Sequence, residues 1–345
     1  MGWDATFDAL STPLALAAPD MEPQRMRPKP EHTGMGLHDI GARALPRCAG
    51  STAGVHPYRV RKLCKAAEFA TLAQALAQWR ADRLARPEGA RATIEIVDSA
   101  TYHEAPCFTL DPGEQLRLCA VGAARPVLHI VGDVGAAKLV IHGGPGRRLA
   151  LEGLTVTGGE IEIDEAPGGA SDAAPFHVTL RHCRLLCERN RDAIGRTPWR
   201  QGSSLCVRAS RVALRIEHCI TGPLGVACAH GSGTTLHVQD STLDGGHAAG
   251  LVITDGAHGA ALIRASFLQS TVIGVVQVQE VELAEDCVFL GPLLVARRSH
   301  GCLRQCYVAP GSRTPSRTLC HPQLPRHTVA ARPAALKALK ALEAA

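Results

Sequence analysis

The chain has 345 residues and a net charge of +5; 46% of the residues are hydrophobic, 20% are charged and only 3% are aromatic. The high hydrophobic content and moderate charge exclude disorder for most of the chain. A transmembrane helix is excluded as well, because no run of about 18 apolar residues lacks a charge or a turn signal. The modest net charge does not single out nucleic acid. We therefore expect neither nucleic acid nor a membrane as a partner.

The thirteen cysteines could suggest a disulfide scaffold, but their number is odd and the chain is too long for one. The N-terminal residues MGWDATFDAL lack the basic and apolar regions of a secretory signal. We therefore expect reduced cysteines, packed as small apolar residues. They indicate a cytoplasmic protein, one that can be released together with an assembly.

Two predicted segments precede the first β pattern. Residues 1–60 contain many Pro, Met and Arg and show no sustained period, which predicts a poorly ordered arm or linker. In residues 61–91 apolar side chains recur near helical spacing, and Arg-Pro-Glu-Gly at 86–89 ends the pattern. We interpret this segment as a capping helix whose apolar stripe consists of Phe69, Leu72, Leu76, Trp79 and Leu84.

From residue 92 onward the chain consists of short β patterns separated by Gly, Pro or polar turns. These are ATIEIVDS, QLRLCAV, PVLHIVGD, AKLVIHG, LALEGLTVTG, FHVTLRHC, VALRIEHC, TTLHVQDS, AALIRASF and VELAEDC. Many end in a small or apolar anchor residue, and the last three intervals between anchors are 22, 25 and 21 residues. This period indicates a solenoid of stacked coils. The anchors are Leu154, Cys183, Cys219, Ser241, Ser266 and Cys287.

A leucine-rich repeat is excluded, because its Leu/Asn ladder and any helix between the strands are absent. The expected fold class is all-β, a single-stranded right-handed parallel β-helix (solenoid) over residues 92–310, with an N-terminal capping helix and extended tails. A narrow core of Val, Ile, Leu, Ala, Cys and Ser agrees with the shortage of aromatic residues. Residues 311–345 are expected to form an extended segment rich in Pro, Arg and Cys and a C-terminal helical tail.

The segment from Cys302 to Pro322 carries the motif G-C-x-R-x-x-Y-V-x-P-G-S-R-T-P-x-R-x-x-C-x-P, with the glycine just before it. It resembles the C-terminal signature of uncharacterised bacterial parallel β-helix proteins with a pectin-lyase-like fold. Upstream segments such as RPVLHIVGD and CVFLGPLLVARR are similar to the coils of that family, so the likeness covers about residues 60–322. The resemblance implies the β-helix fold and an association with phage-tail-like or contractile injection gene clusters. It implies no catalytic residues, because the family has no established activity.

Candidate catalytic residues stand directly before the anchors. On successive coils, His182, His218 and Asp240 could hold a divalent metal, or act as a base and its orienting group. Asp240 and Asp286, roughly 9–10 Å apart, could act as a carboxylate pair. The competing interpretation is a bend where polar turn formers are favourable, and we assign no catalytic residue. The full column is Gly153, His182, His218, Asp240, Ala265 and Asp286.

Candidate metal ligands gather near the C-terminus, where four side chains that can bind zinc fall within 20 residues. Paired C-x2-C motifs at finger spacing are absent. The competing interpretation, which we adopt, is that cysteines such as Cys183, Cys219 and Cys287 are small residues that fill a stacked column, and no cofactor is expected. The four residues are Cys302, Cys306, Cys320 and His321.

Candidate binding residues form two sets. An insertion between two coils, residues 187–204, combines a Trp that has no place in a narrow core with several Arg, a composition typical of interfaces. It contains Arg189, Arg191, Arg196, Trp199 and Arg200. The basic C-terminal end could bind phosphate or an acidic partner surface, the alternative being a solvated end of the solenoid. It contains Arg304, Tyr307, Arg313 and Arg317.

These observations favour a non-enzymatic structural or binding module of a larger, phage-tail-like bacterial assembly, with protein partners. The alternative is a polysaccharide lyase or glycoside hydrolase that acts on an acidic glycan, because the expected architecture resembles pectate lyases and polygalacturonases. The Asp-Asp, Gly-His-Gly and Arg-Ile-Lys patterns of those enzymes are absent from the chain. Fold alone does not imply their activity.

Overall fold

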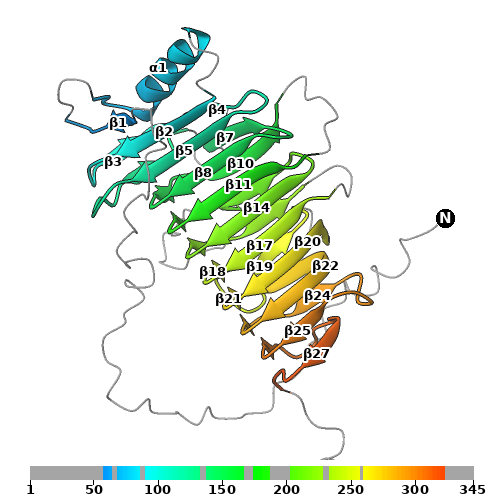
Figure 1. Cartoon of the computed structure of the whole chain (residues 1–345). Coiled ribbons are helices and arrows are strands. Elements are labelled where there is room, and N and C mark those ends of the chain that lie inside the picture. Colours follow the sequence, from blue (N-terminus) through cyan, green and yellow to red (C-terminus); the bar gives the residue numbers. More distant parts are fainter. Residues whose placement is uncertain are drawn as a thin grey trace, which may run out of the picture. The chain divides into compact units, whose positions relative to one another are not determined.

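The computed structural model of the chain describes residues 57–63, 68–85, 90–132, 137–166, 174–186, 203–227, 233–256 and 259–322. Within these residues, strands pair in parallel to form one large and one small sheet, and there is a single helix (Figure 1). The prediction of an all-β chain built from parallel strands is therefore confirmed.

The large sheet has 18 strands in two ladders that share β22. The first ladder contains β1 (Tyr58–Val60), β2 (Arg91–Ile96), β5 (Gln115–Ala120), β8 (Arg148–Glu152), β11 (Phe176–Arg181), β14 (Val212–Glu217), β17 (Thr235–Gln239), β20 (Ala261–Leu268), β22 (Val275–Glu285), β25 (Cys302–Arg304) and β27 (Ser316–Thr318). The second contains β4 (Phe108–Thr109), β7 (Lys138–Gly143), β10 (Glu160–Glu165), β13 (Leu205–Val207), β16 (Leu224–Val226), β19 (Leu251–Thr254), β22 and β24 (Leu293–Val295).

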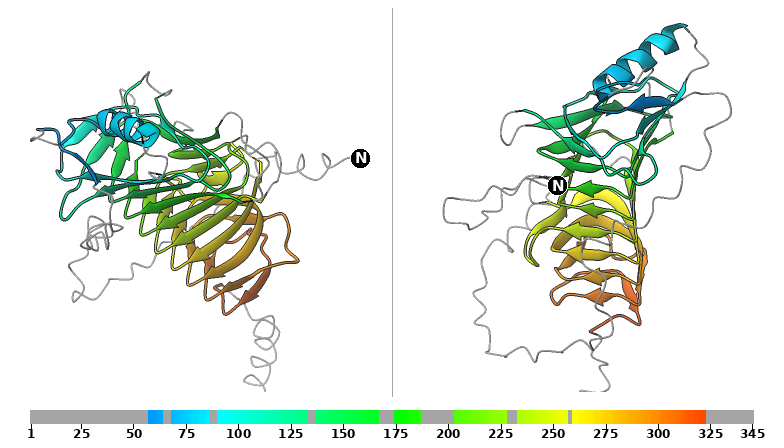
Figure 2. Two further views of the ribbon diagram at one scale, coloured as in Figure 1. Left: turned by 45° about the horizontal axis from the view of Figure 1, so that its top comes forward. Right: turned by 90° about the vertical axis from the view of Figure 1, so that its left-hand side faces the viewer.

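The small sheet has nine strands. They are β3 (Thr101–His103), β6 (Val127–His129), β9 (Thr155–Thr157), β12 (Arg184–Leu185), β15 (Ile220–Thr221), β18 (Thr242–Asp244), β21 (Thr271–Ile273), β23 (Val288–Phe289) and β26 (Tyr307–Val308). Along most of the chain each strand pairs with the strand three positions further on, as in β5–β8, β6–β9 and β7–β10. Figure 2 shows from two directions how the strands follow one another in chain order.

Alternation within the strands decides which side chains form the core. In β2, Ala92, Ile94 and Ile96 are buried, while the residues between them face outward. The parallel register stacks these inward positions, so that Ile94 pairs with Leu118 and Leu118 pairs with Leu151. The core is mainly aliphatic, and the few aromatic residues are concentrated in it: Phe108, Phe176, Phe267 and Phe289 are all fully buried.

The helix α1 (Leu72–Ala85) begins where its free amides find acceptors. The Thr71 hydroxyl accepts a hydrogen bond from the Gln74 amide at 3.1 Å. The Glu104 carboxylate accepts from the amides of Leu72 and Ala73, both at 3.0 Å. A hydroxyl at the N-cap and a carboxylate at the positive end of the helix dipole both stabilise a helix start.

The buried face of α1 is shorter than the predicted stripe. Leu72, Leu76 and Trp79 are buried, but Leu84 is 83% exposed. Leu84 stands five positions after Trp79, which rotates it off the face that residues three or four apart share. Phe69 lies before the helix and forms a parallel bridge with Val60.

The strands extend beyond the predicted limits of 92–310. In β1, which falls in the predicted arm, Tyr58 pairs with Ile94. In β27, which falls in the predicted extended segment, Ser316 pairs with Cys302. The remaining part of the arm (1–56) and the C-terminal helical tail (323–345) lie outside the described residues.

The predicted column of anchors contains one register error. Ser266 pairs with His237 inside β20, whereas the Ser270 hydroxyl accepts a hydrogen bond from the Ser241 amide at 3.2 Å. The anchor beside Ser241 is therefore Ser270, and the residue before it is Gln269 instead of Ala265. The error arose because this repeat is longer: Ser270 follows Ser241 by 29 residues, whereas Ser241 follows Cys219 by 22, and Ser266 is a small residue inside β20.

Candidate functional site

The residues before the anchors form one continuous bend, which we call the turn column. Each of them has a positive φ, between 47° and 74°. Positive φ is uncommon for residues other than glycine and is tolerated best by Asn, Asp and His. The column contains all four catalytic candidates and marks where the chain leaves each strand of the first ladder from β8 onward: Gly153, His182, His218, Asp240, Gln269, Asp286, Gln305 and Leu319.

The side chains of the turn column interact with one another in pairs. The rings of His182 and His218 stack with centroids 4.9 Å apart and planes 6° apart. Burial, and secondarily the neighbouring His218, lower the pKa of His182, which keeps that ring neutral at neutral pH. Asp240 Oδ2 lies 3.9 Å from His218 Nδ1. The candidates thus share a turn, but Gln269 separates Asp240 from Asp286.

The anchors themselves form a second continuous column, the small-residue column. Each thiol or hydroxyl donates to the backbone carbonyl two residues earlier, at 2.6 to 3.5 Å. The same side-chain atom can accept an amide from the preceding repeat, as Ser241 does from Cys219 at 3.0 Å. These bonds satisfy the polar atoms of the column. Its members are Cys183, Cys219, Ser241, Ser270, Cys287, Cys306 and Cys320.

The four metal candidates do not come together as a ligand set. Cys306 and Cys320 are buried in the small-residue column, where their thiols bind backbone carbonyls. Cys302 lies on β25, beside Leu283 and Ser316, and His321 forms a bridge with Tyr307. Across the described ranges, no three His, Cys, Asp or Glu side chains gather where they could hold a metal ion.

The binding candidates at the C-terminal end come from separate elements. Arg304 lies on β25 and Tyr307 on β26, both exposed. The Arg317 guanidinium bonds to the Thr314 hydroxyl at 2.7 Å and to a backbone carbonyl at 3.3 Å, so it stabilises its own turn, while Arg313 is exposed. The candidates of the insertion, Arg189, Arg191, Arg196, Trp199 and Arg200, lie outside the described residues.

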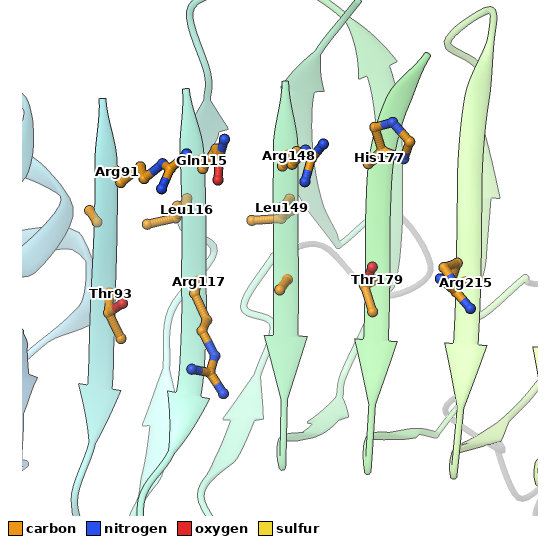
Figure 3. A pocket seen from close by; sticks show the side chains of 12 residues that line it. Arg91, Thr93, Gln115, Leu116, Arg117, Arg148, Leu149, His177, Thr179 and Arg215 are labelled. Atoms are coloured by element: carbon orange, nitrogen blue, oxygen red, sulfur yellow. The ribbon is translucent and has the colours of Figure 1, made fainter. Parts of the chain in front are cut away.

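A cavity of about 500 Å³ lies on the outward side of the first ladder, across β2, β5, β8, β11 and β14. Two in-register columns of outward side chains line it (Figure 3). We call the cavity the basic groove. Its first column, the basic column, is Arg91, Gln115, Arg148 and His177. Its second column is Thr93, Arg117, Ala150, Thr179 and Arg215.

Carboxylates pair with the arginines of the second column but not with those of the first. Arg117 Nη2 lies 2.6 Å from Glu152, and Arg215 Nε lies 3.2 Å from Glu217, which also pairs with Arg181 at 2.6 Å. These glutamates stand one outward position further along the strands. Arg91 and Arg148 form no ion pair with any residue that the structure describes, and no Asp or Glu is among the twelve residues that line the cavity. The basic groove therefore carries a surplus of positive charge.

His177 lies partly buried within this positive surface. Burial lowers the pKa of His177 most, and Arg148 on β8 and Arg215 on β14 lower it further. An anion placed between these three side chains would raise the pKa of His177 and so offset the lowering by the two arginines. The basic groove therefore has the electrostatics of an anion-binding site.

The sequence analysis missed the basic groove, although a signal for it exists. The first outward position of four successive strands in this ladder is Arg, Gln, Arg and His, in RATIEI, QLRLCA, RLALE and FHVTLR. Aligning strand starts in place of the small anchors at strand ends would have placed these residues in one column.

None of the four catalytic candidates lines the basic groove. No helix in the described ranges is long and apolar enough to cross a membrane. No protein-family model, curated protein or solved structure matches the chain.

Proposed function

We propose that the strands form a single-stranded right-handed parallel β-helix that serves as a non-enzymatic binding module of a larger, phage-tail-like bacterial assembly. The recurring pairing of each strand with the third strand after it supports this solenoid. So does the stacking of identical turns in the turn column and the small-residue column.

The basic groove is the observation that carries the binding role. It presents Arg91 and Arg148 without a described ion-pair partner, beside His177, on a rigid parallel sheet. Exposed arginines in a cleft of one sign attract an anionic partner and bind carboxylate or phosphate in a bidentate manner. We therefore place the contact with the partner protein at this groove.

The distribution of carboxylates supports binding over catalysis. A glycosidase or lyase site needs an acid or base within reach of the bound substrate. The lining of the basic groove has no Asp or Glu, and the carboxylates of Asp240 and Asp286 belong to the turn column instead. The residues that would bind a charged ligand are thus separate from the residues first considered for catalysis.

A titration of the full chain with short polyglutamate, a stand-in for an acidic protein surface, tests the proposed function. We expect calorimetry to show binding that weakens with added salt and that Arg148→Gln reduces by about tenfold. Arg264→Gln is the matched control, because Arg264 lies in the same column beyond the groove and pairs with Glu280 at 3.8 Å. Equal binding by both variants would contradict the proposal.

The second candidate function is cleavage of an acidic glycan, which one observation favours. The lowered pKa of His177 makes it a neutral base at neutral pH, next to arginines that could grip a uronate carboxylate. Incubation with polygalacturonate distinguishes the two functions. Products that form with the wild-type chain and disappear with His177→Gln would support the enzyme, and the binding module predicts that no products form.

A further inference from the structure

The basic column has a regular spacing. Arg91, Gln115, Arg148 and His177 are register partners on four neighbouring strands, and Figure 3 shows their side chains side by side. Adjacent strands lie about 4.8 Å apart. The two arginines are therefore roughly 10 Å apart, and His177 lies roughly 5 Å beyond Arg148.

An α-helix laid across the strands has a matching spacing. Residues on one face of a helix recur about every 5 Å, and positions i and i+7 are about 10.5 Å apart. Acidic side chains at i, i+7 and i+11 would reach Arg91, Arg148 and His177 in turn. Same-side residues of an extended peptide recur about every 6.7 Å and fall out of step with the strands.

The lining of the groove favours a helix over a glycan or a nucleic acid. The second column offers the small side chains of Thr93, Ala150 and Thr179 beside its arginines, which leaves room for a ridge of helix side chains. No Phe, Tyr or Trp is among the lining residues. Bases and sugar rings, which favour large aromatic surfaces for stacking, would find only the imidazole of His177 here.

We propose that the basic groove receives an acidic α-helix of a partner protein, which lies across β2 to β11 with its carboxylates on Arg91, Arg148 and His177. This inference rests on the proposed function and names the partner of the same groove. It assigns the specificity to the spacing of the basic column in addition to its charge. A partner of equal charge but different spacing binds less tightly.

Two isomeric helical peptides of about 20 residues, a length that sustains a helix, test the proposal on the full chain. The two peptides contain the same numbers of Ala, Gln and Glu residues. One has its Glu residues at i, i+4, i+7 and i+11 on a single face, and the other has them spread around the helix. We expect the single-face peptide to bind at least about tenfold more tightly, Arg148→Gln to erase this preference, and Arg264→Gln to retain it.

The other outcomes separate the two proposals. Equal affinity of the wild-type chain for both peptides, weakened by Arg148→Gln, would overturn the helix inference and leave an anion-binding groove. Tighter binding of an oligogalacturonate than of either peptide would overturn it in favour of a glycan. Failure of the peptides, polyglutamate and the oligogalacturonate alike to bind would overturn the proposed function as well. Because Arg148 is exposed, its replacement is expected to leave the fold intact, which circular dichroism checks.

Discussion

The basic column and the small-residue column arise from the same parallel register. They differ in whether their polar or charged atoms are bonded to other groups of the protein. In the small-residue column each polar atom is bonded to the backbone of its own or a neighbouring repeat, as Ser241 is to Gln239 and Cys219. In the basic column Arg91 and Arg148 extend from the sheet without a described ion-pair partner. A stacked column of polar residues indicates a binding site only where the protein leaves its charges unpaired.

Reversing the charge of the basic column should have the largest effect on binding and almost none on folding. For Arg91→Glu combined with Arg148→Glu we expect about a hundredfold weaker binding of polyglutamate, because attraction becomes repulsion at two positions. Calorimetry measures the affinity. The control is Arg297→Glu combined with Arg298→Glu, which changes the net charge equally at exposed positions outside the groove. Equal losses in both double variants would mean that net charge alone matters.

A change in the small-residue column should lower the stability of the fold and have almost no effect on binding. Ser241→Ala removes the acceptor of the buried Cys219 amide, and we expect a loss of about 1–3 kcal/mol in the free energy of unfolding. Ser241→Cys keeps an acceptor and should cost less. Denaturant unfolding measures both. A loss of polyglutamate binding by Ser241→Ala without any loss of stability would contradict the division between the two columns.

Removing a carboxylate that pairs with the second column should strengthen anion binding at the basic groove. Glu152 holds Arg117 at 2.6 Å, so Glu152→Gln frees positive charge at the edge of the basic groove. We expect polyglutamate to bind a few-fold more tightly, since this partly buried pair lies near the surface, where an ion pair is worth about 0–1 kcal/mol. Titration at low salt measures this gain. Unchanged or weaker binding would show that Arg117 does not face the ligand.

The smallest expected effect is the pH dependence contributed by His177. Its pKa is lowered in the folded chain, so the unfolded chain binds its proton more readily and stability falls as the pH drops below about 6.5. A bound anion favours the protonated ring, so the affinity for polyglutamate should rise over the same range by less than about tenfold. His177→Gln should flatten both trends. Titrations and melts at several pH values measure them, and slopes unchanged by the substitution would assign them to other groups.

The sequence predicts the strands well because inward and outward residues alternate clearly, as in β2, where Ala92, Ile94 and Ile96 are buried. It also predicts most of the small-residue column, which Ser241 and Cys219 define by their size. The error at Ser266 comes from unequal repeat lengths, since Ser270 follows Ser241 by 29 residues and Ser241 follows Cys219 by 22. A local pattern of small residues does not distinguish Ser266, inside β20, from the anchor that follows the strand.

The basic groove was not predicted because its charge is a property of pairing across the sheet. In the sequence Arg117 and Arg148 are equivalent cations in strand patterns, and only the register shows that Glu152 neutralises Arg117. The catalytic candidates were easier to interpret, because they follow one another along a local pattern. His182 and Asp240 were correctly placed in one column, and their positive φ confirms the bend that the sequence offered as the competing interpretation.

Thermal unfolding with and without polyglutamate tests the division of roles most directly, because it measures stability and binding together. A ligand that binds only the folded chain raises the unfolding temperature according to its affinity. The account predicts that polyglutamate stabilises the wild-type chain. It also predicts that Arg91→Glu combined with Arg148→Glu melts like the wild type when alone and gains nothing from the ligand. Equal stabilisation of both chains would contradict the assignment of the basic groove as the docking site.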